Sequence, residues 1–411
     1  MRRRPRKGEG APSSATRGAS GREAAPLARH YTRFRVADRL LLTGHSHQAW
    51  PDVAFEGQVE AWDDAAELVD EKWERAGEKA NAVRQGFARL LGTSHDEIGL
   101  GVNTHELVVR FLSALPLRTR PKLVTTDGEF HSIRRQLDRL AEDPLLEVVK
   151  VLADPADTLA ERLAAKVDHA TAAVLVSSVL FGNAAIVPGL SLLVQACRRE
   201  GAELLVDVYH HLNVVPFSID TESLREAFVV GGGYKYCQLG EGNCFLRVPP
   251  HAREYRPVFT GWFAEFGRLT RATTGRVTYA EGPERWAGAT YDPTSHYRAA
   301  RVFDFFAKES LTPERLREIS RGQVRLLADR FDDLDLDPDV IARDRSLPLE
   351  RVGGFLALQS PRAGFLSERL QERGVLTDFR GEILRMGPAP YLTDAQLEQA
   401  MAELGKVASK R

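Results

Sequence analysis

The sequence predicts an α/β protein built around an open, mostly parallel sheet, followed by a smaller α+β domain. Between residues 93 and 248, short apolar runs alternate with helix-length segments, an order typical of parallel strands joined by crossover helices. After Pro250 this alternation stops, and a stretch rich in Gly, Pro and aromatic residues leads into a second region of helices and strands. A chain of 411 residues is long for one core, so two domains are expected.

Composition and charge narrow the class of protein. The formal net charge of −1 gives no overall attraction to nucleic acid or acidic membranes. No window approaches the ~18 apolar residues that would cross a bilayer. Three cysteines, Cys197, Cys237 and Cys244, are too few for a disulfide framework and lack the spacing of a zinc site. We therefore expect a soluble, cytoplasmic protein with no metal, no nucleic-acid partner and no membrane partner.

The N-terminal region precedes the sheet. Residues 1–30 are basic and rich in small residues, which predicts a disordered tail, with an organelle presequence as the alternative. Residues 31–55 are expected to form an arm with a short strand or extended segment at 39–44. Apolar residues then recur every three or four positions over 53–91, which predicts helix, and Gly92 ends it.

Two domains are expected after the arm, a large one over residues 56–270 and a small one over 271–411. A strong helical face begins near His296 in the small domain. The strands expected in the large domain are 123–126, 147–151, 173–177, 204–207 and 228–230. The elements expected in the small domain are strands 355–358 and 383–386 and helices 365–373 and 394–404.

An acid and an amine stand where two of the predicted parallel strands end. Asp207 closes one apolar run, and Lys235 follows another after three glycines that leave room for a ligand near the backbone. Ligands of open parallel sheets bind beyond the carboxyl ends of the strands. An amine that can form an imine and a carboxylate that can keep a pyridine nitrogen protonated suit pyridoxal 5'-phosphate. The alternative for Lys235 is an ordinary surface lysine.

The segments around these residues resemble the fold-type I pyridoxal-phosphate enzymes, in the branch that contains class V aminotransferases, cysteine desulfurases and kynureninase. The resemblance extends from about Leu41 to Leu404. Its most specific pieces are residues 206–210, 234–242 and 374–391. It implies a mostly parallel, seven-stranded type of sheet flanked by helices and a pyridoxal 5'-phosphate cofactor.

The resemblance assigns roles around the cofactor ring. Lys235 would hold the cofactor as an imine and then transfer protons, and Asp207 would pair with the pyridinium nitrogen. His210 would lie against the phenolic oxygen or the phosphate, with a buried structural histidine as the alternative. His131 is the better-aligned candidate for the ring that stacks on the pyridine, and Phe130 is the fallback.

Further roles concern the ring hydroxyl and the phosphate. Ser178 matches a position that hydrogen-bonds the ring hydroxyl, although an ordinary strand-end serine is the alternative. Thr104 and His105 lie at the start of a predicted helix, where N–H groups could receive the phosphate, although Thr104 could simply be the N-cap. Tyr234 would contact the phosphate in a kynureninase-like site. Thr290 resembles a segment that reaches the phosphate from a neighbouring subunit, which implies a homodimer with a shared active site.

Two residues are candidates for the substrate. Arg385 is expected to bind the α-carboxylate of an amino acid, because a guanidinium gives this planar anion two parallel hydrogen bonds. Arg380 is a nearby alternative, and a surface salt bridge is the alternative role for Arg385. His45 lies in a Gly-His-Ser sequence that resembles a Gly-Asn-Ser motif near the N terminus of the family.

The resemblance implies an enzyme that acts on an amino acid through an external aldimine, most like a kynureninase-type hydrolase that cleaves a β-keto amino acid. No cysteine follows Cys244, which argues against a cysteine desulfurase. Three departures argue for a remodelled pocket: His45 replaces the asparagine, Tyr209 stands where a small residue usually packs on the cofactor, and residues 72–91 lack the expected aryl-ketone signature. A class V aminotransferase or lyase is therefore the alternative, and a cofactor-free scaffold is the less favoured one.

Overall fold

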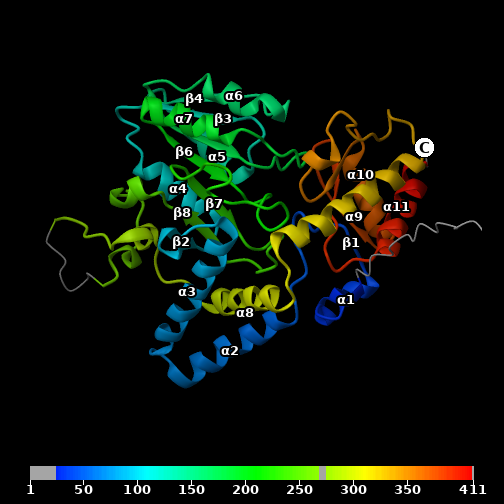
Figure 1. Ribbon diagram of the computed structural model, residues 1–411, viewed down its shortest axis with the longest axis horizontal. Helices are drawn as coiled ribbons and strands as arrows, with labels where there is room; N and C mark the ends of the chain where they lie inside the picture. Colours follow the sequence, from blue (N-terminus) through cyan, green and yellow to red (C-terminus); the bar gives the residue numbers. More distant parts are fainter. Residues whose placement is uncertain (1–24, 268–274, 410–411) are drawn as a thin grey trace, which may run out of the picture.

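The computed structural model describes residues 25–267 and 275–409, so most of the predicted basic tail lies outside the described residues. A seven-stranded sheet forms the centre of the larger domain (Figure 1). In spatial order its strands are β2 (Ile98–Gly101), β8 (Cys244–Arg247), β7 (Phe228–Gly232), β6 (Glu203–Asp207), β5 (Thr171–Ser177), β3 (Lys122–Thr126) and β4 (Glu147–Val151). Among these seven, β8 alone runs against its neighbours. The predicted mostly parallel sheet is confirmed.

Helices cover both faces of this sheet, as parallel strands require. On one face, apolar residues of α4 and α5 pack with alternate residues of the strands. On the other face, α6, α7 and α3 contribute to a second and larger cluster. The bounds of these helices are α3 (Lys72–Leu91), α4 (Thr104–Ala114), α5 (His131–Leu140), α6 (Leu159–Ala164) and α7 (Leu190–Glu200).

The helical stretch expected at 53–91 is two helices, α2 (Val53–Leu68) and α3. The chain turns between them at Val69, whose φ of 52° is rare for a β-branched residue. Gly92 ends α3 in the left-handed region, with φ 61°, as expected. No helix among the described residues is long and apolar enough to span a membrane.

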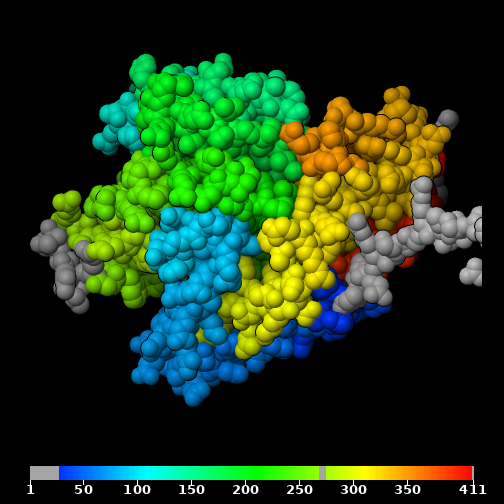
Figure 2. All heavy atoms as spheres, viewed as in Figure 1, coloured from blue at the N-terminus to red at the C-terminus, as the bar shows by residue number. Residues whose placement is uncertain are grey.

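Helix α8 (Thr294–Lys308) packs on α2 and α3, and Figure 2 shows these blue and yellow segments in close contact. It therefore joins the large domain. The boundary at residue 271 stays a prediction, and this packing favours a later one.

The small domain combines helices with a three-stranded antiparallel sheet in the order β11-β12-β9. A separate parallel pair joins β1 of the N-terminal arm to β10. The elements of this domain are β1 (Leu40–Leu41), α9 (Pro313–Asp333), β9 (Leu356–Gln359), α10 (Ala363–Glu372), β10 (Val375–Leu376), β11 (Asp378–Arg380), β12 (Ile383–Met386) and α11 (Asp394–Ala408). The short helix α1 (Ala25–Ala28) precedes the arm.

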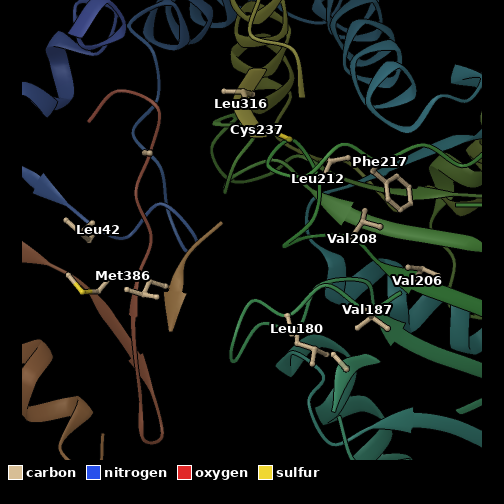
Figure 3. Packing of buried hydrophobic residues seen from close by; sticks show 14 of the residues in the cluster. Leu42, Leu180, Val187, Val206, Val208, Leu212, Phe217, Cys237, Leu316 and Met386 are labelled. Atoms are coloured by element: carbon tan, nitrogen blue, oxygen red, sulfur yellow. The ribbon is translucent and has the colours of Figure 1, made fainter. Parts of the chain in front are cut away.

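Side-chain alternation along and just beyond β6 sets the direction of the site. Val206 and Val208 belong to the larger apolar cluster, and Figure 3 shows them near Leu212 and Phe217. Because successive residues of a strand point to opposite faces, Asp207 points to the other side, the side covered by α4. The acid is thus directed away from this core and toward a cavity beside α4.

Candidate active site

A cavity of about 200 Å³ lies at the carboxyl ends of β5, β6 and β7. Asp207 and Lys235 both line it, as the strand-end argument predicts. Its other lining residues are Val102, Asn103, Thr104, His105, Phe130, Ser132, Ser177, Val179, Phe181, Tyr209, His210, Tyr234, Glu241, Gly242 and Cys244.

Lys235 lines this cavity and lies close to His210. Its side chain is buried, and Nζ lies 2.7 Å from Nε2 of His210. The other ring nitrogen of His210, Nδ1, is buried and has no hydrogen-bond partner among the described residues. Asp207 is also buried, and its Oδ1 accepts a hydrogen bond from the backbone N–H of Tyr209 (2.8 Å). An acid, an amine and an imidazole therefore share one water-poor site.

Burial shifts the pKa of all three groups toward their neutral forms. It lowers the pKa of Lys235, although the nearby Asp207 carboxylate acts in the opposite direction. It raises the pKa of Asp207, against the hydrogen bond from Tyr209 and the charge of Lys235. It lowers the pKa of His210 well below its usual value, and the Lys235 charge adds to that effect. An amine that is readily neutral can form an imine and accept protons.

The start of α4 forms one wall of the cavity. Asn103 is the N-cap, because its side chain accepts from the N–H of Glu106 (2.9 Å). Thr104 is therefore the first helical residue and not the cap, and its hydroxyl donates to Ser132 Oγ at 3.3 Å. His105 also lines the cavity and lies 3.0 Å from the amide of Gln136. The predicted phosphate-binding end of the helix thus faces the cavity.

His131 and Ser178, which were expected to contact the cofactor, lie outside the cavity lining, and neighbouring residues take their places. His131 is exposed and contacts Arg134, whereas Phe130 lines the cavity with its ring centroid 5.2 Å from Lys235 Nζ. The structure therefore favours the fallback, Phe130, over His131. Ser178 Oγ donates to the backbone oxygen of Asp207 and lies 3.1 Å from the ring Nδ1 of His211, whereas Ser177 lines the cavity. In both cases the residue that lines the cavity is the one just before the predicted residue, because adjacent side chains point in different directions.

Arg385 is buried in an ion pair with Asp378, a residue to which the sequence analysis gave no role. Its Nε and Nη2 donate to the two carboxylate oxygens at 2.7 Å each, and Nη1 donates to the backbone oxygen of Phe181 (2.7 Å). Phe181 lines the cavity, which places Arg385 just behind it. Arg380 is more exposed and lies 3.3 Å from Asp378.

His45 takes part in the same network and does not line the cavity. It is fully buried, and its Nε2 lies 3.4 Å from Asp378 Oδ1. Burial lowers the pKa of His45 to about 4. Burial alone would raise the pKa of Asp378, but the hydrogen bond to His45 and the pairing with Arg385 lower it to about 2. His45 thus reaches the site through Asp378.

The last two predicted residues lie in different places. Tyr234 lines the cavity and stacks on His47, with ring centroids 4.9 Å apart. Thr290 is exposed and lines a second, larger hollow of about 1130 Å³, which shares Val102 and His105 with the first. Within one chain, Thr290 is therefore not among the residues around Lys235.

Glu129 is a buried acid beside the site that the sequence analysis did not assign. Its Oε1 accepts from Thr126 Oγ1 (2.7 Å) and from the N–H of Ser177 (3.1 Å). Its Oε2 lies 2.6 Å from Ser177 Oγ. Burial raises the pKa of Glu129 to about 7, against these hydrogen bonds. The sequence could not single out this residue, because nothing in the sequence distinguishes a buried glutamate from an exposed one.

The Glu129→Gln variant is expected to remove part of the pH dependence of stability. The folded pKa of about 7 lies above the ordinary value of 4.5, so the carboxyl stabilises the fold below that value and this contribution is lost as pH rises through 7. Glutamine mimics the protonated acid. The unfolding free energy of the variant, relative to that of wild type, should rise by up to about 3 kcal/mol between about pH 5 and about pH 8. Urea unfolding of both proteins at the two pH values measures this difference, and a difference that does not change with pH would contradict the prediction.

No family model matches the chain. In sequence it is similar to the uncharacterized aminotransferase YcbU of Bacillus subtilis (23% identity; 81% of this chain, 85% of the relative). It is also similar to kynureninase of Geobacillus thermodenitrificans (24%; 78% and 75%) and to isopenicillin N epimerase of Streptomyces clavuligerus (25%; 77% and 81%).

Solved structures show the same fold. One is a mutant of C-DES with glycine covalently linked to its PLP cofactor, with a TM-score of 0.79 and 16% identity over 92% of this chain and 98% of that chain. Another is the apo cysteine desulfurase from Thermococcus onnurineus NA1, with a TM-score of 0.76 and 16% identity over 95% and 98%. The fold is that of the fold-type I pyridoxal-phosphate enzymes. The sequence relatives confirm the predicted resemblance to their class V branch.

Proposed function

We propose that this chain is a pyridoxal-phosphate-dependent enzyme that acts on an amino acid, most like a kynureninase-type hydrolase of a β-keto amino acid. The observation that carries the proposal is that Lys235 and Asp207, on neighbouring strand ends, are buried in one cavity. An acid and an amine facing different cavities would have excluded a shared pyridine ring.

The residues of the cavity fit this cofactor. The unpartnered Nδ1 of His210 offers a polar contact for a bound ligand, and the start of α4 offers N–H groups to an anion. The ring of Phe130 supplies an apolar wall beside the amine. When bound, the cofactor supplies an electron-withdrawing ring that stabilises negative charge on the substrate. The contacts proposed here are those of Lys235, Asp207, His210, Phe130, Thr104, His105 and Tyr234.

Lys235 would act in the reaction as a base at its Nζ. Its buried, desolvated position favours the neutral amine, which can take a proton from the substrate. His210, 2.7 Å away, would hold that amine in place. Asp207 would pair with the pyridine nitrogen of the bound cofactor and keep it protonated. The N–H of Tyr209 orients the Asp207 carboxylate for this role.

Arg385 would orient the substrate through its α-carboxylate. Asp378 and Phe181 occupy Nε and one hydrogen each of Nη1 and Nη2. One N–H of each terminal nitrogen is left to donate to a second carboxylate. Asp378 would fix the orientation of the guanidinium, with His45 supporting Asp378.

The kynureninase-type reaction is favoured by the kynureninase relative and by the aromatic residues that flank Lys235. A desulfurase reaction is disfavoured because no cysteine follows Cys244 and because burial raises the pKa of that thiol to about 12. An aminotransferase or lyase of the same branch is the second candidate, favoured by the similarity to the aminotransferase of Bacillus subtilis.

The assembly and location follow as parts of the same proposal. Thr290 lines the second hollow and not the Lys235 cavity of its own chain, so it would reach the cofactor phosphate of a second subunit in a homodimer. The free, buried cysteines suit a reducing cytoplasm.

Product analysis distinguishes the candidate reactions. We expect the purified holoenzyme to release alanine and the aromatic acid from L-kynurenine or 3-hydroxykynurenine, which chromatography detects. Transfer of the amino group to a keto acid without release of the aromatic acid would replace the hydrolase by the aminotransferase. A cofactor spectrum unchanged by a full panel of amino acids would contradict both.

A further inference from the structure

The backbone on either side of Lys235 folds back on itself. The N–H of Gln238 donates to the backbone oxygen of Lys235 (3.0 Å), and the N–H of Leu239 donates to that of Gly233 (2.9 Å). A Cβ on Gly233 would lie 2.8 Å from Cβ of the buried Leu239, so this fold-back requires a glycine. Lys235 therefore stands on a closed loop, residues 233–239, and the position of its amine depends on how that loop is held.

Gln238 gives this loop a backbone conformation that residues other than glycine rarely adopt. Its φ is 58°, in the left-handed region, and its side chain is fully buried. Such conformations persist where the surrounding contacts enforce them, and they cluster at functional sites. Asn213, with φ 65°, supports the loop as well, because its side-chain amide donates to the backbone oxygen of Tyr236 at 3.1 Å. Two strained residues thus converge on the loop that carries Lys235.

The N-terminal arm supplies the contacts that hold Gln238. The hydroxyl of Tyr31 donates to Oε1 of Gln238 (2.6 Å), and Nε2 of Gln238 donates to Oε1 of Gln48 (2.7 Å). All three side chains are buried, and the ring of Tyr31 packs on Tyr391 with centroids 4.7 Å apart. A buried hydrogen-bonded chain therefore runs from the arm to the loop of Lys235, and loss of one member leaves the others unsatisfied.

We propose that Gln238 is a positioning residue that, held by Tyr31 and Gln48 of the arm, fixes the amine of Lys235 for its reaction with the cofactor aldehyde. This inference rests on the proposed function. In that reaction Nζ adds to the aldehyde carbon, and the aldehyde oxygen leaves as water with the two hydrogens of the neutral amine. Gln238 does not line the cavity, so it would act through the loop and not by touching the cofactor.

The test measures the rate of imine formation and not activity. Apoproteins of wild type, Gln238→Ala and Tyr31→Phe are mixed with pyridoxal 5'-phosphate, and the absorbance that borohydride bleaches is followed over time. Because a misplacement of about 1 Å can slow a reaction between two held groups about 100-fold, we expect Gln238→Ala to react about 10- to 100-fold more slowly. Tyr31→Phe should show a smaller slowing, and the double variant should be no slower than Gln238→Ala, because both changes act on the same contacts.

Tyr279→Phe is the matched control for Tyr31→Phe. Tyr279 is buried, and its hydroxyl donates to the backbone oxygen of Pro257 (2.5 Å), a contact that involves neither the arm nor the Lys235 loop. This variant should form the imine at the wild-type rate. Thermal melts show which apoproteins are folded at the temperature of the rate measurements, and Tyr31→Phe decides the question if Gln238→Ala does not fold.

The outcomes separate this inference from the proposed function. Wild-type rates in folded Gln238→Ala and Tyr31→Phe would overturn the positioning role while leaving the cofactor in place. A slowing in Tyr279→Phe equal to that in Tyr31→Phe would also overturn it, because the effect would then follow from any lost buried hydrogen bond. No cofactor uptake by wild type would overturn the proposed function itself.

Discussion

The Lys235→Ala variant is expected to lose the long-wavelength absorbance of the bound cofactor, together with its bleaching by borohydride. The amine is buried in the cavity beside His210, and no other lysine of the described residues lines that cavity, so none of them can replace it as the imine-forming group. Removing the base should also lower turnover by roughly 10²- to 10⁴-fold. Absorption spectra before and after borohydride provide the measurement.

Lys150→Ala is the matched control for this experiment. Lys150 lies on β4, pairs with Asp138 and is partly exposed, so its loss should leave the spectrum intact. A Lys235→Ala protein that keeps a borohydride-sensitive absorbance would refute the assignment of Lys235.

The Arg385→Met variant is expected to be strongly destabilised and to bind amino acids poorly. Asp378 would remain largely buried with its main cation gone, and breaking such a pair costs about 3–5 kcal/mol. Loss of the guanidinium should also raise KM for an amino-acid substrate more than it changes kcat. Equilibrium urea unfolding measures the stability, and steady-state kinetics measure the substrate effect.

The double variant Arg385→Met/Asp378→Asn identifies the cause. An uncharged amide at position 378 can still hydrogen-bond His45, so stability should recover in part while the high KM persists. If the double variant were as unstable as the single one, the buried carboxylate would not be the source of the destabilisation.

Much of the fold was predictable because most strands of a parallel sheet are continuous apolar runs. β4 and β12 have the predicted bounds, and the other expected strands differ by one or two residues. The sequence analysis missed β2 and β8, which are four residues each and form the antiparallel part of the sheet. Their pairing joins distant segments and leaves no local pattern. The sequence also did not predict the helix boundary at Val69, because neither Gly nor Pro stands there.

The site was predictable where a residue ends a strand and less so elsewhere. Asp207 and Lys235 share a cavity because parallel strands end on one edge of a sheet. The choice between Phe130 and His131 depends on the direction of one side chain at the start of α5, which a sequence does not specify. The pairing of Arg385 with Asp378 depends on the hairpin of β11 and β12, and that register becomes visible only in the folded chain.

The pairing of β1 with β10 has a consequence for how this protein is made. Leu40 and Leu41 align with Val375 and Leu376, and Thr43 forms a bridge to Gly387. The arm with β1 is synthesised early, but β1 cannot pair until β10, near the end of the chain, has also been synthesised. Such distant contacts slow folding and prolong the exposure of apolar segments. A version shortened at its start would leave β10 as an open edge, prone to recruit strands from other molecules.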